Sequence, residues 1–87
     1  MMDLFKELEF EDVGLGRKQA RMEFDNNYGA SIMTGAGTFS NKDKPYELAV
    51  LYCKSLCYTT NITSDVLGWL TEHEVNQVLN DIKQLKD

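Results

Sequence analysis

The residues of this chain that could do chemistry are one histidine, two cysteines and several carboxylates. His73 stands between Glu72 and Glu74, where neighbouring carboxylates could tune an imidazole for acid–base catalysis. The same position falls on the side of a predicted helix that faces away from its apolar stripe, so we expect His73 to be solvated. No serine or cysteine has a base at a spacing that identifies a nucleophile. We therefore predict a protein that is not an enzyme.

The two cysteines, Cys53 and Cys57, are separated by three residues. This spacing is neither the Cys-x-x-Cys of redox enzymes nor half of a zinc site, and a single histidine supplies no second pair of ligands. We predict no metal and no cofactor. A turn at 54–55 would let the thiols approach across a hairpin, and whether they ever form a disulfide stays open. A reducing cytosol keeps such pairs reduced, and we expect both thiols to be buried.

Two glycine pairs, in Gly14-Leu15-Gly16 and Gly35-Ala36-Gly37, resemble loops that cradle phosphate groups. Neither joins a strand directly to a helix with the rest of a known fingerprint, so the helix N-terminus that would hold a phosphate is missing. We interpret both as flexible turns, although a ligand at the second loop stays open. The short basic group of Arg17, Lys18 and Arg21 is interpreted as a solvated strand edge.

The candidates for a binding surface are the N-terminal acids and two aromatic residues. Within the first twelve residues there are five acids and one base, a local charge of −4. Such an anionic patch can attract a basic groove on another protein. Aromatic rings in turns and loops lie at the surface, where they anchor interfaces, whereas Trp69 is expected in the core or at its rim. The predicted partner-binding residues are Asp3, Glu7, Glu9, Glu11, Asp12, Tyr28 and Phe39.

The N-terminal half predicts a short helix followed by a β-hairpin. The apolar residues at 4, 5 and 8 have the spacing of one edge of a helix that ends before Gly14. From 20 to 25 apolar and charged residues alternate, which is typical of a half-buried strand. A type I turn closed by Gly29 in a left-handed bulge would then place Ile32 opposite Phe24 on one face of the hairpin.

The middle of the chain predicts a loop and two further strands. Residues 35–45 are rich in glycine and polar side chains, so we expect a mobile connecting loop. Residues 46–53 form the most apolar segment, which is expected to be a central strand buried on both faces. Residues 56–60 are expected to pair back on it through the turn at 54–55.

The C-terminal segment predicts an amphipathic helix. Thr71 and Glu74 have the spacing of a capping box. The apolar stripe of the helix comprises Val75, Val78, Leu79, Ile82 and Leu85. A helix this short needs a larger apolar surface to pack on, and the sheet supplies it.

We therefore predict an α+β fold, in which a small antiparallel sheet of three or four strands packs against a C-terminal amphipathic helix, with a short N-terminal helix. The single domain, 1–87, divides into an acidic N-terminal helix or arm (1–16), an antiparallel sheet (17–62) and a C-terminal helical segment (63–87).

Length and composition restrict the function further. Eighty-seven residues make one domain at most, and 43% hydrophobic with 26% charged residues is typical of a chain that folds. A net charge of −5 argues against direct binding to nucleic acid or anionic lipid. No apolar run approaches the roughly 18 to 20 residues of a membrane span, and no signal peptide can be read at the start, so we expect a cytoplasmic protein. Homo-oligomerisation stays open, because the core is small and an open sheet edge can pair.

Three segments carry a resemblance to a known group of proteins. They are FDNNYGAS at 24–31, PYELAVL at 45–51 and ITSDVLGWLT at 62–71. Together they resemble a family of small, uncharacterised proteins encoded by bacteriophages and prophages, in which no catalytic or ligand residues are established. The resemblance runs from about residue 24 to the end, so the acidic first twelve residues lie outside it.

The resemblance implies a phage accessory protein that acts in the host cytoplasm. Small acidic phage proteins often bind and inhibit a host protein, including components of defence systems such as CRISPR, and we expect this function here. A net charge of −5 is too low for close mimicry of duplex DNA, so a protein-binding module is the preferred form of this idea. Two alternatives remain: an oligomeric protein that binds a small ligand such as a nucleotide, or a small enzyme, with its pocket between Gly-rich loops; and a component of virion assembly.

Overall fold

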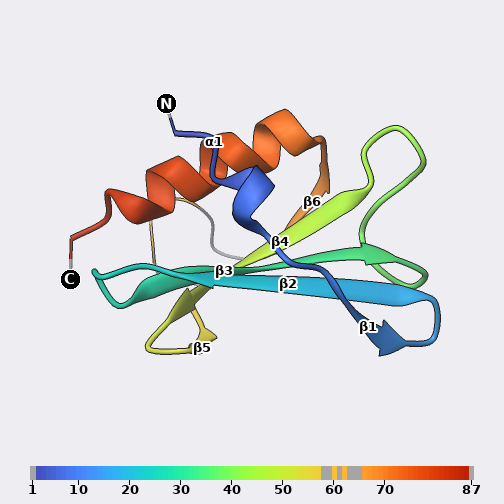
Figure 1. The fold of residues 1–87 in the computed structure, drawn as a ribbon, viewed down its shortest axis with the longest axis horizontal. Coiled ribbons are helices and arrows are strands. Elements are labelled where there is room, and N and C mark those ends of the chain that lie inside the picture. Colours follow the sequence, from blue (N-terminus) through green and yellow to red (C-terminus); the bar gives the residue numbers. More distant parts are fainter. Residues whose placement is uncertain (1, 58–59, 61, 63–65, 87) are drawn as a thin grey trace.

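The computed structural model describes residues 2–57, 60, 62 and 66–86. Helix α1 lies along one side of a curled antiparallel sheet, and the N-terminal segment runs beside that helix (Figure 1). The elements in chain order are η1 (Phe5–Glu7), β1 (Glu11–Gly14), β2 (Arg17–Glu23), β3 (Tyr28–Gly35), β4 (Tyr46–Tyr52), β5 (Ser55–Leu56), β6 (Leu67–Leu70) and α1 (Glu72–Lys83). The predicted α+β fold with a C-terminal helix on an antiparallel sheet is confirmed.

The sheet is larger than predicted, with six strands among the described residues instead of three or four. The additional strands are short and lie outside the predicted range of 17–62. β1 pairs with β2, with Glu11 opposite Gln19, and β6 pairs with β4. The predicted N-terminal helix is reduced to the single 3₁₀ turn η1. From Leu8 to Glu11 apolar and acidic residues alternate, a period that suits an extended chain better than a helix.

The β2–β3 hairpin forms with a register that differs from the predicted one. Ile32 lies opposite Ala20, and Ala30 lies opposite Met22, so the pairing of Ile32 with Phe24 was wrong. The two registers differ by an even number of residues. The same side chains therefore face the core in both, as the period of two requires.

The turn of this hairpin explains the shift in register. Asn27, with φ of 69°, takes the left-handed position that was expected for Gly29. Asparagine enters this region more readily than most residues, because its short polar side chain can bond locally. The Phe24 N–H donates to the Tyr28 carbonyl oxygen at 2.8 Å and closes the loop. Gly29 instead lies within β3, where a Cβ would collide with the Met22 carbonyl oxygen.

β4 is the central strand, and its burial on both faces is confirmed from Leu48 to Leu51. Its connection to β5 lies one residue earlier than predicted: Cys53 and Lys54 both have positive φ, at 50° and 71°. This is the arrangement of a two-residue hairpin turn. The turn exposes Cys53, so its predicted burial was wrong, whereas Cys57 is half-buried. β5 is shorter than the predicted strand at 56–60, and residues 58 and 59 lie outside the described residues.

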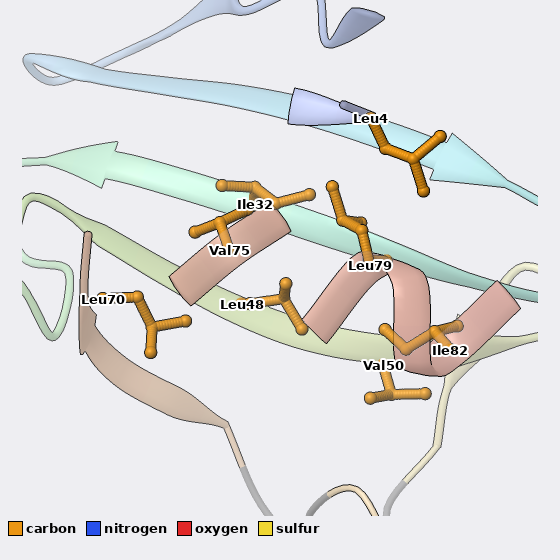
Figure 2. Packing of buried hydrophobic residues seen from close by; sticks show 9 residues of the cluster. Leu4, Ile32, Leu48, Val50, Leu70, Val75, Leu79 and Ile82 are labelled. Carbon is orange, nitrogen blue, oxygen red and sulfur yellow. The ribbon is translucent and has the colours of Figure 1, made fainter. Parts of the chain in front are cut away.

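The core lies between α1 and the sheet. Val75, Leu79 and Ile82 of the helix point toward the side chains of Ile32, Leu48 and Val50, as Figure 2 shows. Leu4 and Leu70 complete the labelled cluster. None of the described helices has the length and apolar character that crossing a membrane would require.

The predicted capping box at the start of α1 is confirmed. The Glu74 N–H donates to Thr71 Oγ1 at 3.2 Å, and the Thr71 N–H donates to Glu74 Oε1 at 3.0 Å. The hydrogen bond from the Thr71 backbone N–H holds the pKa of Glu74 below its ordinary value of 4.5, and the Thr71 side chain adds to this effect. A lowered pKa means that the folded state favours the ionised carboxylate. Its contribution to stability is therefore present above pH 4.5 and is lost as the pH falls through the folded-state pKa.

Replacing Glu74 should remove part of the acid sensitivity of the fold. Glu74→Gln keeps an oxygen that can accept from the Thr71 N–H but no longer titrates. We expect its free energy of unfolding, measured by urea titration across pH 3 to 6, to fall less on acidification than that of the unaltered protein. Glu72→Gln is the matched control, because Glu72 lies in the same turn outside the capping box. Identical pH dependence in the Glu74 variant and the unaltered protein would contradict this account.

Candidate functional site

The N-terminal arm, residues 2–10, is held against α1 by two asparagines one helical turn apart. Asn76 Oδ1 accepts from the N–H groups of Leu4 and Phe5, at 2.7 and 3.0 Å, and its Nδ2 donates to the Met2 carbonyl oxygen at 3.0 Å. Asn80 bonds both the N–H and the carbonyl of Met2, at 3.2 and 2.9 Å. The two side-chain amides thus satisfy backbone N–H and carbonyl groups of the arm, as the backbone of a neighbouring strand would. The side chain of Leu4 lies in the core. The arm is therefore a fixed part of the fold.

Three aromatic rings join the arm to β4. Phe5 and Phe10 lie 5.3 and 5.7 Å from the ring of Tyr46, and 6.3 Å from each other. Burial raises the pKa of the Tyr46 phenol, and the charge of Glu72 adds to the effect. The arm is thus held at both ends of η1, by hydrogen bonds to the helix and by ring contacts to the sheet.

Three of the five predicted acidic residues lie around one open hollow of about 300 Å³. The side chains of Glu7, Glu9 and Glu11 are all exposed. The hollow is lined by Glu7, Glu9, Glu11, Val13, Gln19 and Arg21. Three carboxylates and one guanidinium leave this lining with a charge of −2. We call this surface the acidic hollow.

The other two predicted acids serve local turns. Asp3 Oδ1 accepts from the Lys6 N–H at 3.4 Å, at the start of η1. Asp12 Oδ1 accepts from the Gly14 N–H at 2.7 Å, beside the β1–β2 turn. Neither lines the acidic hollow. The predicted acidic patch is therefore narrower than the run of acids in the sequence.

The two predicted aromatic residues lie far apart. Tyr28 begins β3, is half-buried and packs against Tyr52 at 4.8 Å between ring centroids. Phe39 lies in the loop after β3 and is 55% exposed. Tyr28 stands at the first residue of β3, whereas Phe39 lies in the loop that follows its last residue, Gly35. Phe39 is an accessible anchor for a partner, whereas Tyr28 is largely engaged within the fold.

Trp69 is the exposed aromatic residue that the sequence reasoning missed. Its side chain is 52% exposed, so its expected place in the core or at its rim was wrong. Gly68 and Trp69 together lie opposite the single residue Glu47 of β4, which makes a β-bulge. The bulge allows Leu67 and Leu70, three positions apart, to face the core. A regular strand cannot place both on one face, so this spacing is the signal that could have revealed Trp69.

Phe39 and Trp69 form an aromatic pair. Their ring centroids are 5.6 Å apart, and the backbone N–H of Trp69 donates to the Phe39 carbonyl oxygen at 2.7 Å. The Phe39 N–H donates to Glu47 Oε1 at 2.8 Å. A Cβ at Gly68 would lie only 2.7 Å from the Cβ of Phe39, so glycine permits the loop to approach β6. We call Phe39, Trp69 and Glu47 the aromatic subsite.

Of the residues considered for catalysis, His73 lies near Glu72, but Cys53 lies on a different element. His73 is exposed, as expected, and lines an open hollow beside Asp3 and Glu72. Cys53 lies in the β4–β5 turn. Across residues 2–57, 60, 62 and 66–86, no three His, Cys, Asp or Glu side chains are placed to hold a metal ion.

The two glycine-rich segments contact each other. The Ala36 N–H donates to the Gly16 carbonyl oxygen at 3.3 Å, and a Cβ at Gly35 would collide with that same oxygen. Gly35 also has a φ of 110°, which other residues rarely adopt. Close packing of the two turns therefore accounts for Gly35, and positive φ angles account for Gly14, Gly16 and Gly37, without a phosphate.

Comparisons with protein-family models, with curated proteins and with solved structures find no match. The acidic hollow and the aromatic subsite are therefore the features of this protein that bear on its function.

The asparagine contacts predict that the arm depends on Asn76. Asn76→Ala leaves the N–H groups of Leu4 and Phe5 without their acceptor, so we expect a loss of about 1–3 kcal/mol in the free energy of unfolding. Urea denaturation measures the loss, and amide hydrogen exchange should show faster exchange at both N–H groups. Gln77→Ala, at an exposed position of the same helix, is the control. Equal stability of the two variants would contradict the asparagine account.

Proposed function

We propose that the protein is a phage-encoded accessory factor that acts in the host cytoplasm by binding and inhibiting a host protein. The observation that carries the proposal is the ordered row of three exposed glutamates, Glu7, Glu9 and Glu11, around the acidic hollow. Because the arm is already fixed, these carboxylates need little further ordering when a partner binds. A defence-system protein with a basic groove is the partner that this surface would suit best.

The position of β1 supports a protein partner. β1 ends the order of strands β1-β2-β3-β4-β5, and all four of its residues are exposed. An edge strand can accept an extended segment of another chain through main-chain hydrogen bonds. The carboxylates of Glu11 and Asp12 would repel the same strand of a second copy and attract a basic segment. The edge and the acidic hollow therefore favour the same kind of partner.

The alternative functions receive less support from the described residues. The carboxylates of the acidic hollow would repel the phosphates of a nucleotide. The Gly-rich segments, which were the other candidate for a ligand pocket, pack on each other. A role in virion assembly could use the same protein-binding surface, and mass spectrometry of purified particles would identify it.

Neutralising the acidic hollow should weaken binding to the host partner. The triple variant Glu7→Gln, Glu9→Gln, Glu11→Gln should capture less host protein from a lysate and associate with it about tenfold more slowly at low salt, because it loses long-range attraction. The matched control is Glu23→Gln, Glu72→Gln, Asp81→Asn, which removes the same charge from exposed positions elsewhere. Capture in a series of salt concentrations, with identification by mass spectrometry, makes the comparison. Unchanged capture and salt sensitivity in the hollow variant would remove the charge mechanism.

Thermal denaturation separates this proposal from nucleotide binding. A nucleotide present at one hundred times its dissociation constant would add about 2.7 kcal/mol to the free energy of unfolding. We expect no change in the midpoint of unfolding with ATP, GTP or their diphosphates. A rise in the midpoint that saturates with nucleotide concentration would favour the ligand-binding alternative.

A further inference from the structure

The aromatic subsite joins two exposed rings and one carboxylate through the backbone of Phe39. The Phe39 N–H holds Glu47 Oε1 at 2.8 Å, and its carbonyl oxygen accepts from the Trp69 N–H at 2.7 Å. The rings of Phe39 and Trp69 lie 5.6 Å apart at an interplanar angle of 33°. Phe39 and Trp69 are both more than half exposed to solvent. The three groups come from β4, β6 and the loop between β3 and β4, so they meet only in the folded chain.

The backbone at Trp69 is strained in a way that exposes the indole. Its φ is 54°, in the left-handed region that residues other than glycine, asparagine and aspartate rarely enter. The strain lies in the β-bulge that faces Glu47, and bulges often redirect a side chain next to a functional site. Strained residues of this kind occur preferentially where a structure binds something. The bulge leaves the single tryptophan of the chain half exposed beside Phe39.

The charges around these rings select the occupant. An aromatic pair alone would suit any apolar partner, but Glu47 places a carboxylate at the base of Phe39. The faces of aromatic rings attract cations, and a planar guanidinium can stack on a ring while it donates hydrogen bonds to a carboxylate. The net charge of −5 adds to the attraction for a cation and opposes contact with a second copy of this chain.

We propose that Phe39, Trp69 and Glu47 bind an arginine side chain of the partner protein. This inference rests on the proposed function and names the chemistry of one contact within it. The guanidinium stacks against the exposed rings and donates to the Glu47 carboxylate. This contact adds a specific anchor to the general attraction of the acidic hollow for basic segments.

Trp69 makes the subsite directly observable, because it is the only tryptophan in the chain. The probe is N-acetyl-arginine amide, titrated into the full-length protein while sodium chloride keeps the ionic strength constant. Its neutral isostere, N-acetyl-citrulline amide, is the matched control ligand. We expect the arginine derivative to change the tryptophan fluorescence saturably, and the citrulline derivative to bind at least several-fold more weakly. Equal binding of the two ligands would overturn the assignment of a cation site.

Two variants test the named residues. Glu47→Gln keeps an acceptor for the Phe39 N–H but removes the charge, and Phe39→Leu removes one ring. Each should weaken binding of the arginine derivative about two- to fivefold, the effect expected for a single exposed cation–π contact or ion pair. Glu23→Gln makes the same change in net charge at an exposed position outside both the acidic hollow and the aromatic subsite, and it should leave the affinity unchanged. If Glu23→Gln weakens binding as much as Glu47→Gln does, general attraction explains the affinity and the subsite is refuted.

The fold of each variant is checked separately from binding. Urea denaturation followed by circular dichroism establishes that Glu47→Gln and Phe39→Leu are folded at the temperature of the titration. If Phe39→Leu does not fold, the comparison of Glu47→Gln with Glu23→Gln still decides the question. Capture of a host protein that depends on the acidic hollow, without binding of the arginine derivative, would overturn this inference and leave the proposed function intact. Binding of the arginine derivative without capture of any host protein would support the cation site and contradict the proposed function.

Discussion

The fold depends on asparagine side chains that replace missing backbone partners around α1. Asn76 and Asn80 bind the N-terminal arm on one side of the helix. Asn26, in the β2–β3 turn, donates to the carbonyl oxygens of Ile82 and Leu85 at 2.9 and 2.8 Å, at and just beyond the C-terminal end of α1. A chain of 87 residues has a small core, so a helix fixed to both the arm and a hairpin turn keeps that core closed.

The same contacts position the acidic hollow. Leu4 can enter the core only if the backbone around it is hydrogen-bonded, and Asn76 provides those bonds. Once Leu4 and the ring of Phe5 are in place, the chain leaves η1 in extended form and pairs as β1 with β2. Glu7, Glu9 and Glu11 are thereby presented on a fixed backbone. The same contacts of Asn76 thus hold the arm's carboxylates in place and keep the core closed.

The sequence predicted the elements whose signals are local. The capping box of Thr71 and Glu74 and the apolar stripe of the helix depend on neighbours within one or two turns, and the long apolar run of β4 identifies a central strand. β1 and β6 could not be obtained in this way. Their conformations depend on distant partners: the asparagines of α1 for the arm, and Glu47 and Phe39 for the bulge. The composition identified the five acids as a group. Only the folded structure distinguishes the three glutamates of the acidic hollow from Asp3 and Asp12, which accept hydrogen bonds from nearby backbone N–H groups.

The strands β1 and β6 lie on opposite sides of the sheet and differ in what surrounds them. β1 is exposed and carries the carboxylates of Glu11 and Asp12, which would repel a second copy of the same strand. At β6 the Phe39 loop lies against the strand, and the Phe39 carbonyl oxygen accepts from the Trp69 backbone N–H. Repulsion between like charges leaves the β1 edge open to a basic segment, whereas a covered edge can recognise a partner only through side chains. This difference is the reason that we propose a strand-like partner at the β1 edge and a single cationic side chain at the aromatic subsite.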